Sequence, residues 1–337
     1  MKLRCRYWLR DGRWIGIAIS LLVVYSGLIC AAVTSRAPAV GGLCGIAAGV
    51  IAIVMFLIGH ELCHGAYRMS GIARRCCAAV LFMPTLHRPS LWIVAHNNRH
   101  HNWVNLAGRD PVYAPVAVDA YGKLSPARRA VERIVRSFPG FVLIYFFKNW
   151  LPHQLVPSRD LAMSCGSRSR YRAETVAMIA AATAHMAFLL VYAMYGGGMW
   201  TFVIGGAIPW LTWNSLMSWA TLLQHTHPSV RWYADENLWQ RDRARDRSTV
   251  HIVMPKILRC LFLNIMEHGA HHRVPYLGFL CLHELQEERD ADPGSIVERA
   301  SFGVLLAVLR KCRLYDYHNH CWCDWSGSVT TGPVMHS

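Results

Sequence analysis

Hydrophobic residues gather in long blocks along this chain, and polar segments separate the blocks. Four blocks are long enough to cross a bilayer as a helix, which takes about 20 residues. They are Trp14–Val33, Val40–Gly59, Val176–Tyr195 and Met199–Leu223. Short turns at Thr34–Ala39 and Gly196–Gly198 join them in pairs. The pattern predicts an all-α integral membrane protein with four transmembrane helices in two hairpins.

Two weaker apolar stretches are predicted to be interfacial or re-entrant. Cys76–Ala95 is interrupted by Pro84, His87, Arg88 and Pro89, and Phe138–Leu151 is too short to span. The first long block is not a signal peptide, because its apolar core is too long and a second span follows almost at once.

Composition agrees with this pattern and changes how the charge is interpreted. The chain is 53% hydrophobic and carries 13 tryptophans and a formal charge of +15. If the N-terminus is cytoplasmic, every Lys and Arg except Arg36 falls on the cytoplasmic side, which is a strong positive-inside bias. The positive charge is therefore explained by the membrane topology and by contact with anionic lipid headgroups, and it does not indicate a nucleic-acid partner. The twelve cysteines lack the spacing of a secreted disulfide scaffold.

These features predict a multi-pass protein, in the inner or plasma membrane if the source is bacterial, with both termini and the active site cytoplasmic. A single membrane domain is expected over 14–285, between a basic N-terminus at 1–13 and a C-terminal helix and tail at 286–337. Within that domain, 60–175 and 224–285 are predicted to form a cytoplasmic helical cap.

Most of the 18 histidines lie in four clusters. The clusters are HELCH (60–64), HNNRHH (96–101), QHTH (224–227) and HGAHH (268–272). The first and third begin where predicted spans end, and the other two lie in the predicted cytoplasmic segments. All four therefore reach the same face of the membrane.

Spacing within the clusters predicts metal binding. Residues i, i+3 and i+4 share one face of a helix, so His60 can point with His64, and His96 with His100 while His101 lies beside them. His268, His271 and His272 can likewise point together. Imidazole is neutral at pH 7 and binds iron, zinc or copper. Eight or nine such rings suggest two metal ions, and iron is the expected metal if the chemistry uses oxygen.

HELCH also matches the H-E-x-x-H motif of zinc proteases. A zinc protease needs three protein ligands, so at least six clustered histidines would have no role. The Glu-x-x-His of carboxylate di-iron bundles is another comparison, but no second such motif lies near the other clusters. A non-catalytic membrane protein that binds haem or metal is the remaining alternative.

In this order around the apolar blocks, four segments resemble the membrane fatty acid desaturase superfamily, and most closely the Δ12/ω3-type acyl desaturases. They are HELCH, RHHNWVNLAGRDPVYAP (99–115), LLQHTHPSVRWY (222–233) and HGAHHRVPY (268–276). The resemblance covers roughly 40–285. It implies a histidine-ligated di-iron centre that uses O₂ and two electrons to introduce a cis double bond into an acyl chain carried on lipid, CoA or acyl carrier protein. Hydroxylation, acetylenation, or oxygenation of a carotenoid or other lipid on the same scaffold is the alternative.

The resemblance also implies a set of metal ligands. They are His60, His64, His96, His100, His101, His225, His268, His271 and His272, with His227 held in reserve for His225. The second cluster departs from the commonest family pattern, because three residues rather than two separate His96 from His100. Glu61 and Asp110 are candidates for orienting the metal-bound rings, and the alternative for each is a hydrated carboxylate.

The fourth block carries a polar stripe of Asn214, Ser218, Thr221 and His225. Such residues either pack helices together or contact substrate and metal-bound water. His185, midway along the third block, needs a partner, which the fourth block could supply. Trp210, Trp213 and Trp219, together with the aromatic residues of 141–147, could line an acyl tunnel.

The C-terminal run YHNHCWC (317–323) is too cramped for the usual zinc spacing. No haem-attachment motif or fused electron-transfer domain is recognisable. A separate electron donor of the ferredoxin, rubredoxin or cytochrome b5 type is therefore the expected protein partner, with membrane lipid and a fatty acyl substrate.

Overall fold

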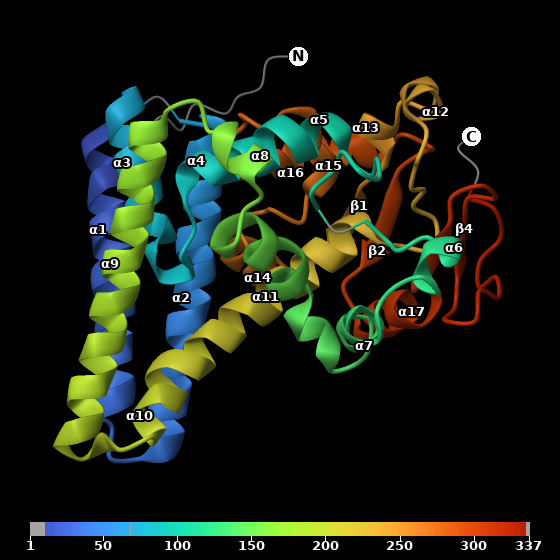
Figure 1. Ribbon diagram of the computed structural model, residues 1–337. Coiled ribbons are helices and arrows are strands. Elements are labelled where there is room, and N and C mark those ends of the chain that lie inside the picture. The colour runs from blue at the N-terminus through green and yellow to red at the C-terminus, as the bar shows by residue number, and fades with distance from the viewer. Residues whose placement is uncertain (1–10, 68, 113, 335–337) are drawn as a thin grey trace. The chain divides into compact units, whose positions relative to one another are not determined.

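A computed structural model describes residues 11–67, 69–112 and 114–334 (Figure 1). Most of the predicted basic N-terminus at 1–13 lies outside these residues. The chain divides into two compact units, which are described separately. Unit 1 comprises Met1–Val94 and Val156–Leu216, and unit 2 comprises Ala95–Leu155 and Met217–Ser337.

Unit 1 is built from long apolar helices and short helical segments. Its elements are α1 (Asp11–Thr34), α2 (Pro38–His64), α3 (Gly71–Phe82), η1 (Met83–Thr85), α4 (Pro89–Trp92), α8 (Arg159–Met163), α9 (Arg168–Tyr192), η5 (Ala193–Gly197), α10 (Trp200–Phe202) and η6 (Val203–Ala207). Helices α1, α2 and α3 pack against one another (Figure 1). Helix α11 (Ile208–His225) begins in unit 1 and ends in unit 2, and so does the π-helix η2 (Ile93–His100).

Three of the four predicted spans are confirmed as helices long and apolar enough to cross a membrane. Within the described residues these helices are Gly12–Thr34, Pro38–His64 and Arg168–Gly197. The fourth predicted span is not confirmed as one helix. It is divided into α10, η6 and α11, and α11 has a lower apolar content because of its polar stripe.

The predicted interruption in the stretch Cys76–Ala95 is present. Helix α3 ends before Pro84, and a new helix starts at Pro89 because a proline suits the first turn but not the interior. The segments Gly71–Thr85 and Pro89–Trp103 meet at 94°, as in a broken span or a re-entrant loop. The stretch Phe138–Leu151 forms only the short helices η3 (Gly140–Leu143) and part of η4 (Phe146–Leu155).

Small residues bring α2 close to the start of α11. A Cβ added at Gly45 would lie 2.6 Å from the carbonyl oxygen of Ile204, and one added at Gly49 would lie 2.6 Å from that of Pro209. Glycines four residues apart on one face let two backbones approach, as membrane helices commonly do. A larger side chain at either position would push η6 and α11 away from α2.

Unit 2 is assembled from short elements. They are α5 (His101–Trp103), α6 (Val118–Tyr121), α7 (Pro126–Val135), η3, η4, α12 (Glu236–Arg241), α13 (Ala244–Arg247), β1 (Val250–Val253), α14 (Lys256–Leu261), α15 (His268–Arg273), η7 (Phe279–Cys281), α16 (Leu282–Asp290), β2 (Ile296–Arg299), α17 (Phe302–Lys311), β3 (Leu314–Asp316) and β4 (Cys321–Cys323). The fold is mostly helical, but the all-α prediction is wrong in detail. Strands β1 and β2 pair in parallel, with Val250 opposite Ile296, and β3 pairs antiparallel with β4.

The C-terminal residues form part of the core of unit 2. Tyr315 and Trp322 are fully buried, and their rings lie 4.9 Å apart. The Tyr315 hydroxyl accepts a hydrogen bond from the backbone N–H of Trp232, and the Trp322 indole N–H donates to the carbonyl of His227. The run 317–323 is therefore part of the β3–β4 hairpin, which packs against the segment following α11.

Candidate metal centre

In unit 1, the first histidine cluster lies at the end of α2. His60 and His64 are one turn apart, so their rings share a face, and their Nε2 atoms lie 3.2 Å apart. Gly65 ends the helix in the left-handed conformation (φ 76°), which glycine adopts without strain. The cluster therefore forms a pair of imidazoles directed the same way, at the terminus of a candidate membrane span.

In unit 2, four histidines from three elements converge. His100 comes from η2, His225 ends α11, and His268 and His272 come from α15. One ring nitrogen of each lies within 4.8 Å of the others, and all four side chains are buried. The Nε2 atom of His268 lies 2.8 Å from that of His225 and 3.1 Å from that of His272. We call these residues the four-histidine group.

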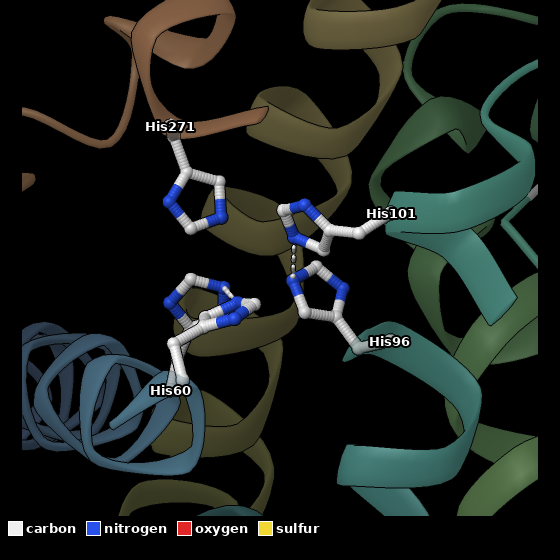
Figure 2. A group of neighbouring side chains, drawn as sticks. His60, His96, His101 and His271 are labelled. Atoms are coloured by element: carbon white, nitrogen blue, oxygen red, sulfur yellow. Dashed lines mark hydrogen bonds between the residues drawn. The ribbon is translucent and has the colours of Figure 1, made fainter. Parts of the chain in front are cut away.

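A second set in unit 2, the three-histidine group, contains His96, His101 and His271. Figure 2 shows the rings of His96 and His101 facing each other, with Nε2 atoms 3.1 Å apart, and the His271 ring near them. One ring nitrogen of each again lies within 4.8 Å of the others. His271 is fully buried. Seven of the nine predicted ligands thus fall into two groups within this unit.

The α-helical spacing explains how α15 serves both groups. His268 and His272 are four residues apart and belong to the four-histidine group, whereas His271 belongs to the three-histidine group. Each residue of an α-helix is turned about 100° from the last, so adjacent residues point in different directions. One short helix therefore supplies ligands in two directions.

The second cluster also supplies ligands to both groups, but through a different kind of helix. Its residues up to His100 belong to the π-helix η2, in which each turn holds about one more residue than in an α-helix, and His101 begins α5. His96 therefore faces His101, five residues on, while His100 points to the four-histidine group. The expectation that His96 would pair with His100 on an α-helical face is corrected. The extra residue of this cluster is taken up by the wider turn.

Asp110 fixes the orientation of His100. Its Oδ1 atom lies 2.9 Å from His100 Nδ1, and its Oδ2 atom accepts a hydrogen bond from the backbone N–H of Asn105. An Nδ1–H donated to this carboxylate leaves Nε2 as the free, metal-binding nitrogen. In unit 1, Glu61 stands in a similar relation to His60, with Oε1 3.3 Å from His60 Nδ1.

Burial favours the neutral form of two rings in the four-histidine group, those of His225 and His272. Loss of solvent lowers the pKa of His225 well below its usual value, and the neighbouring His100 and His268 lower it further. The pKa of His272 is lowered for the same first reason and then by His101. Neutral imidazole is the form that binds a metal. Nε2 atoms that face each other at 2.8–3.1 Å need a shared proton or a cation between them.

Two other histidines named from the sequence, His227 and His185, belong to neither group. His227, the reserve ligand, has its Nε2 atom 3.3 Å from Glu298 Oε1 and accepts a hydrogen bond from the backbone N–H of Ser229. His185 finds its partner in η6, where its Nε2 atom lies 3.1 Å from the carbonyl oxygen of Gly205. Of the described residues, none from the tail run 317–323 joins a group that could hold a metal.

The polar stripe of α11 includes one clear packing residue. The Ser218 hydroxyl donates to the carbonyl of Val142 and accepts from the backbone N–H of Tyr145. It therefore ties α11 to η3, which contains Val142, and to Tyr145 just beyond it, as polar residues between membrane helices usually do. Asn214 is fully buried at the unit 1 end of the stripe.

A partly buried hydrogen-bond network that the sequence pattern did not reveal holds α15. Gln286 Oε1 accepts a hydrogen bond from the backbone N–H of Ala270, and its amide donates to Asp290. Asp290 in turn lies 2.7 Å from His251 Nδ1 on β1. The spacing of Gln286 and Asp290, four residues apart on one helix face, was a usable signal. Its connection to the fourth cluster, on α15, required the tertiary structure.

Comparison with known proteins decides the family. The family model for fatty acid desaturases matches residues 36–301, which contain all four histidine clusters. The chain belongs to the fatty acid desaturase family. The implied class of activity is oxidoreduction, and HELCH lies within the region that the desaturase family model matches.

Three relatives illustrate the placement within this desaturase family. The chain is 24% identical to the omega-6 fatty acid desaturase, chloroplastic, of Glycine max, over 80% of this chain and 61% of that protein. It is 23% identical to the sn-1 oleoyl-lipid 12-desaturase of Anabaena variabilis, covering 77% of this chain and 73% of the relative. It is 26% identical to the sn-1 oleoyl-lipid 12-desaturase of Picosynechococcus sp., covering 79% of this chain and 74% of that protein. These names confirm the resemblance to Δ12-type desaturases.

Proposed function

We propose that this desaturase introduces a cis double bond into a fatty acyl chain in an O₂-dependent reaction at the membrane. The observation that carries the proposal is the pair of histidine groups in unit 2, buried and drawn from η2, α5, α11 and α15. Two relatives are named for an oleoyl-lipid, which supports a lipid-borne acyl chain as the substrate.

The donor set fits iron. All-imidazole groups with one carboxylate behind His100 suit a borderline metal such as iron, and burial favours the neutral, metal-binding form of His225 and His272. We propose two iron ions held by all nine predicted histidines. His60 and His64 are included because they form a further facing pair at the end of α2.

When bound, the iron would activate O₂ for the removal of one hydrogen from each of two adjacent methylenes. Two further electrons and two protons would complete the reduction of O₂ to two waters. The residues of this chain position the ligands and exclude water. Asp110 holds the proton on His100 Nδ1, and the Gln286–Asp290 pair fixes the start of α15. Burial of both groups excludes bulk water from the reaction. The electrons would come from a separate donor protein.

Hydroxylation, acetylenation or oxygenation of another lipid would use the same ligands, so product analysis is the test. Expression in a host of known fatty-acid profile, followed by mass spectrometry, should show a new acyl product two hydrogens lighter with no added oxygen. The His268→Ala variant should show none, and the His227→Ala variant should match the wild type. A product that gains oxygen would assign the chain to the alternative reaction.

We also propose a multi-pass topology with the histidine clusters and both termini cytoplasmic, which the distribution of Lys and Arg supports. Alkaline phosphatase fused after Arg36 should be active, because the enzyme works only outside the cytoplasm. Green fluorescent protein fused after Ser337 should fluoresce. The reverse result at either position would contradict the proposed orientation.

A further inference from the structure

Unit 1 contains a cavity of about 480 Å³ that the proposed metal chemistry does not use. Its walls come from the middle of α1, α2 and α9, from the bend after α3 and from the start of α11. This volume lies in the usual range for small-molecule sites. Its position halfway along candidate membrane spans is unusual for a water-soluble ligand.

Small side chains create the hollow. Ala52 of α2, Ala181 and Ala182 of α9, and Gly206 of η6 all face it. Close packing is the rule in protein interiors, so a space lined by this many small residues between large neighbours indicates room for a further group.

The cavity has an exposed rim and a buried floor. Met186 of α9 and Ser26 of α1 line it and are exposed, Met186 at 52%. Ala52 and Trp213 at the other end are buried at 3% and 1% exposure. The rim residues belong to helices long and apolar enough to cross a membrane, so the medium that meets them is lipid. A ligand would enter sideways from the bilayer.

Aromatic rings form the floor and lead to the first histidine cluster. The Trp213 ring lies 5.7 Å from that of His87 and 6.4 Å from that of Phe56. Phe56 contacts Trp92 at 5.0 Å, and Trp92 lies 5.8 Å from His60. All of these rings belong to unit 1. A layer of aromatic side chains therefore separates the cavity from a predicted iron ligand.

The lining selects the class of ligand. Among the described residues that line the cavity there is no Asp, Glu, Lys or Arg, and His185 places its Nε2 atom against the Gly205 carbonyl. A phosphate or the diphosphate of coenzyme A would find no cationic partner. A hydrocarbon chain would meet Leu, Met, Ala and Trp side chains and gain about 0.8 kcal/mol for each buried methylene.

We propose that this cavity receives an acyl chain of a membrane glycerolipid, as the site where the lipid-borne substrate first binds before it reaches the histidine clusters. The lateral rim admits the chain from the bilayer, and the layer of Phe56, His87, Trp92 and Trp213 limits how far it advances towards His60. The inference rests on the proposed function, because it takes the bound chain to be the substrate chain.

Filling the cavity tests this inference. Ala182→Trp places a large ring in the hollow, and Ala181→Phe is a second, smaller obstruction. Ala184→Trp is the matched control, because Ala184 lies on the same helix, is exposed and does not line the cavity. Iron content identical to that of the wild type would show that a variant is folded.

The probe is a phosphatidylcholine with a diazirine at the end of its sn-1 chain, presented in vesicles with the purified full chain. Irradiation should label peptides that contain Met83, Leu86 or Met186, which line the cavity. Ala182→Trp and Ala181→Phe should each reduce this labelling about tenfold, equivalent to about 1.4 kcal/mol of binding. They should lower product formation from the lipid-borne chain in parallel, whereas Ala184→Trp should change neither.

Three results would overturn the inference. One is labelling in the cavity variants equal to that of Ala184→Trp. Another is loss of labelling with unchanged product formation, which would make the bound chain a resident lipid. The third is stronger labelling by the same chain carried on coenzyme A. A wild-type chain that is labelled but forms no product would instead refute the proposed function and leave the binding site standing.

Discussion

At the scale of single residues, Asp110 is the carboxylate with the clearest role. It joins His100 to the backbone of the following loop through three contacts, to His100 Nδ1 and to the backbone N–H groups of Asn105 and Val112. The sequence made Asp110 only a candidate, because the loop that returns it to His100 has no periodic pattern.

Replacing Asp110 by Asn should weaken iron binding by roughly 10- to 100-fold, because the amide no longer holds a proton on His100 Nδ1 as a carboxylate does. The measurement is iron retained by the purified protein during titration with a chelator. Glu236→Gln is the control, since Glu236 forms an exposed pair with Arg109 that contributes little. Equal iron retention in the two variants would exclude an orienting role for Asp110.

His225 and His227 offer a matched pair two residues apart. His225 lies 2.8 Å from His268, whereas His227 contacts Glu298. We predict that His225→Ala loses iron while His227→Ala retains it, as measured by elemental analysis of purified protein. The reverse pattern would make the reserve candidate the ligand.

At the scale of elements, the π-helix η2 is the feature that periodicity could not predict. The spacing predicts an α-helical face for 96–101, and the structure instead places His96 opposite His101. The sequence did contain a signal for the π-helix. Three residues separate His96 from His100, whereas two separate His268 from His271. A single extra residue inside a helix is the usual origin of a π-turn, often at a functional site.

Deletion of Asn98 should therefore be tolerated. It would give the second cluster the spacing of the fourth, HGAHH, and an α-helical turn would replace the wide turn with little change in the positions of the rings. We expect iron content within about twofold of the wild type. Deletion of Gly269 is the matched control, because α15 has no wide turn to absorb the loss and His268 would rotate by about 100°. Equal loss of iron in both deletions would contradict this explanation.

The helices themselves were predictable to different extents. The apolar blocks that became α1, α2 and α9 are uniform, so length and hydropathy sufficed. The fourth block was not confirmed as one span, because its glycines at 205 and 206 fall in a π-turn and its polar stripe reduces hydropathy. The short strands of unit 2 depend on pairing partners distant in the chain, such as Val250 and Ile296, which local pattern cannot reveal.

At the scale of the whole molecule, the arrangement combines long apolar helices with a unit of short elements that brings histidines together. Seven predicted ligands meet within unit 2, although they come from segments up to 176 residues apart along the chain, from His96 to His272. Clustering in the sequence indicated which residues would meet. The division into two groups and the network behind α15 came only from the folded chain.

The same scale explains why so many polar groups can be buried in an apolar protein. Each ring of the four-histidine group would be costly to bury alone, and a shared cation would satisfy several Nε2 atoms together. We therefore expect metal binding and the positions of these rings to depend on each other.

The most direct test is the iron content of the purified full-length chain, measured together with its ability to form a double bond in a lipid-borne acyl chain. We predict about two iron ions for each chain, loss of both iron and product in His268→Ala, and retention of both in His227→Ala. Double-bond formation by a chain stripped of iron, or iron content unchanged by His268→Ala, would contradict the central claim.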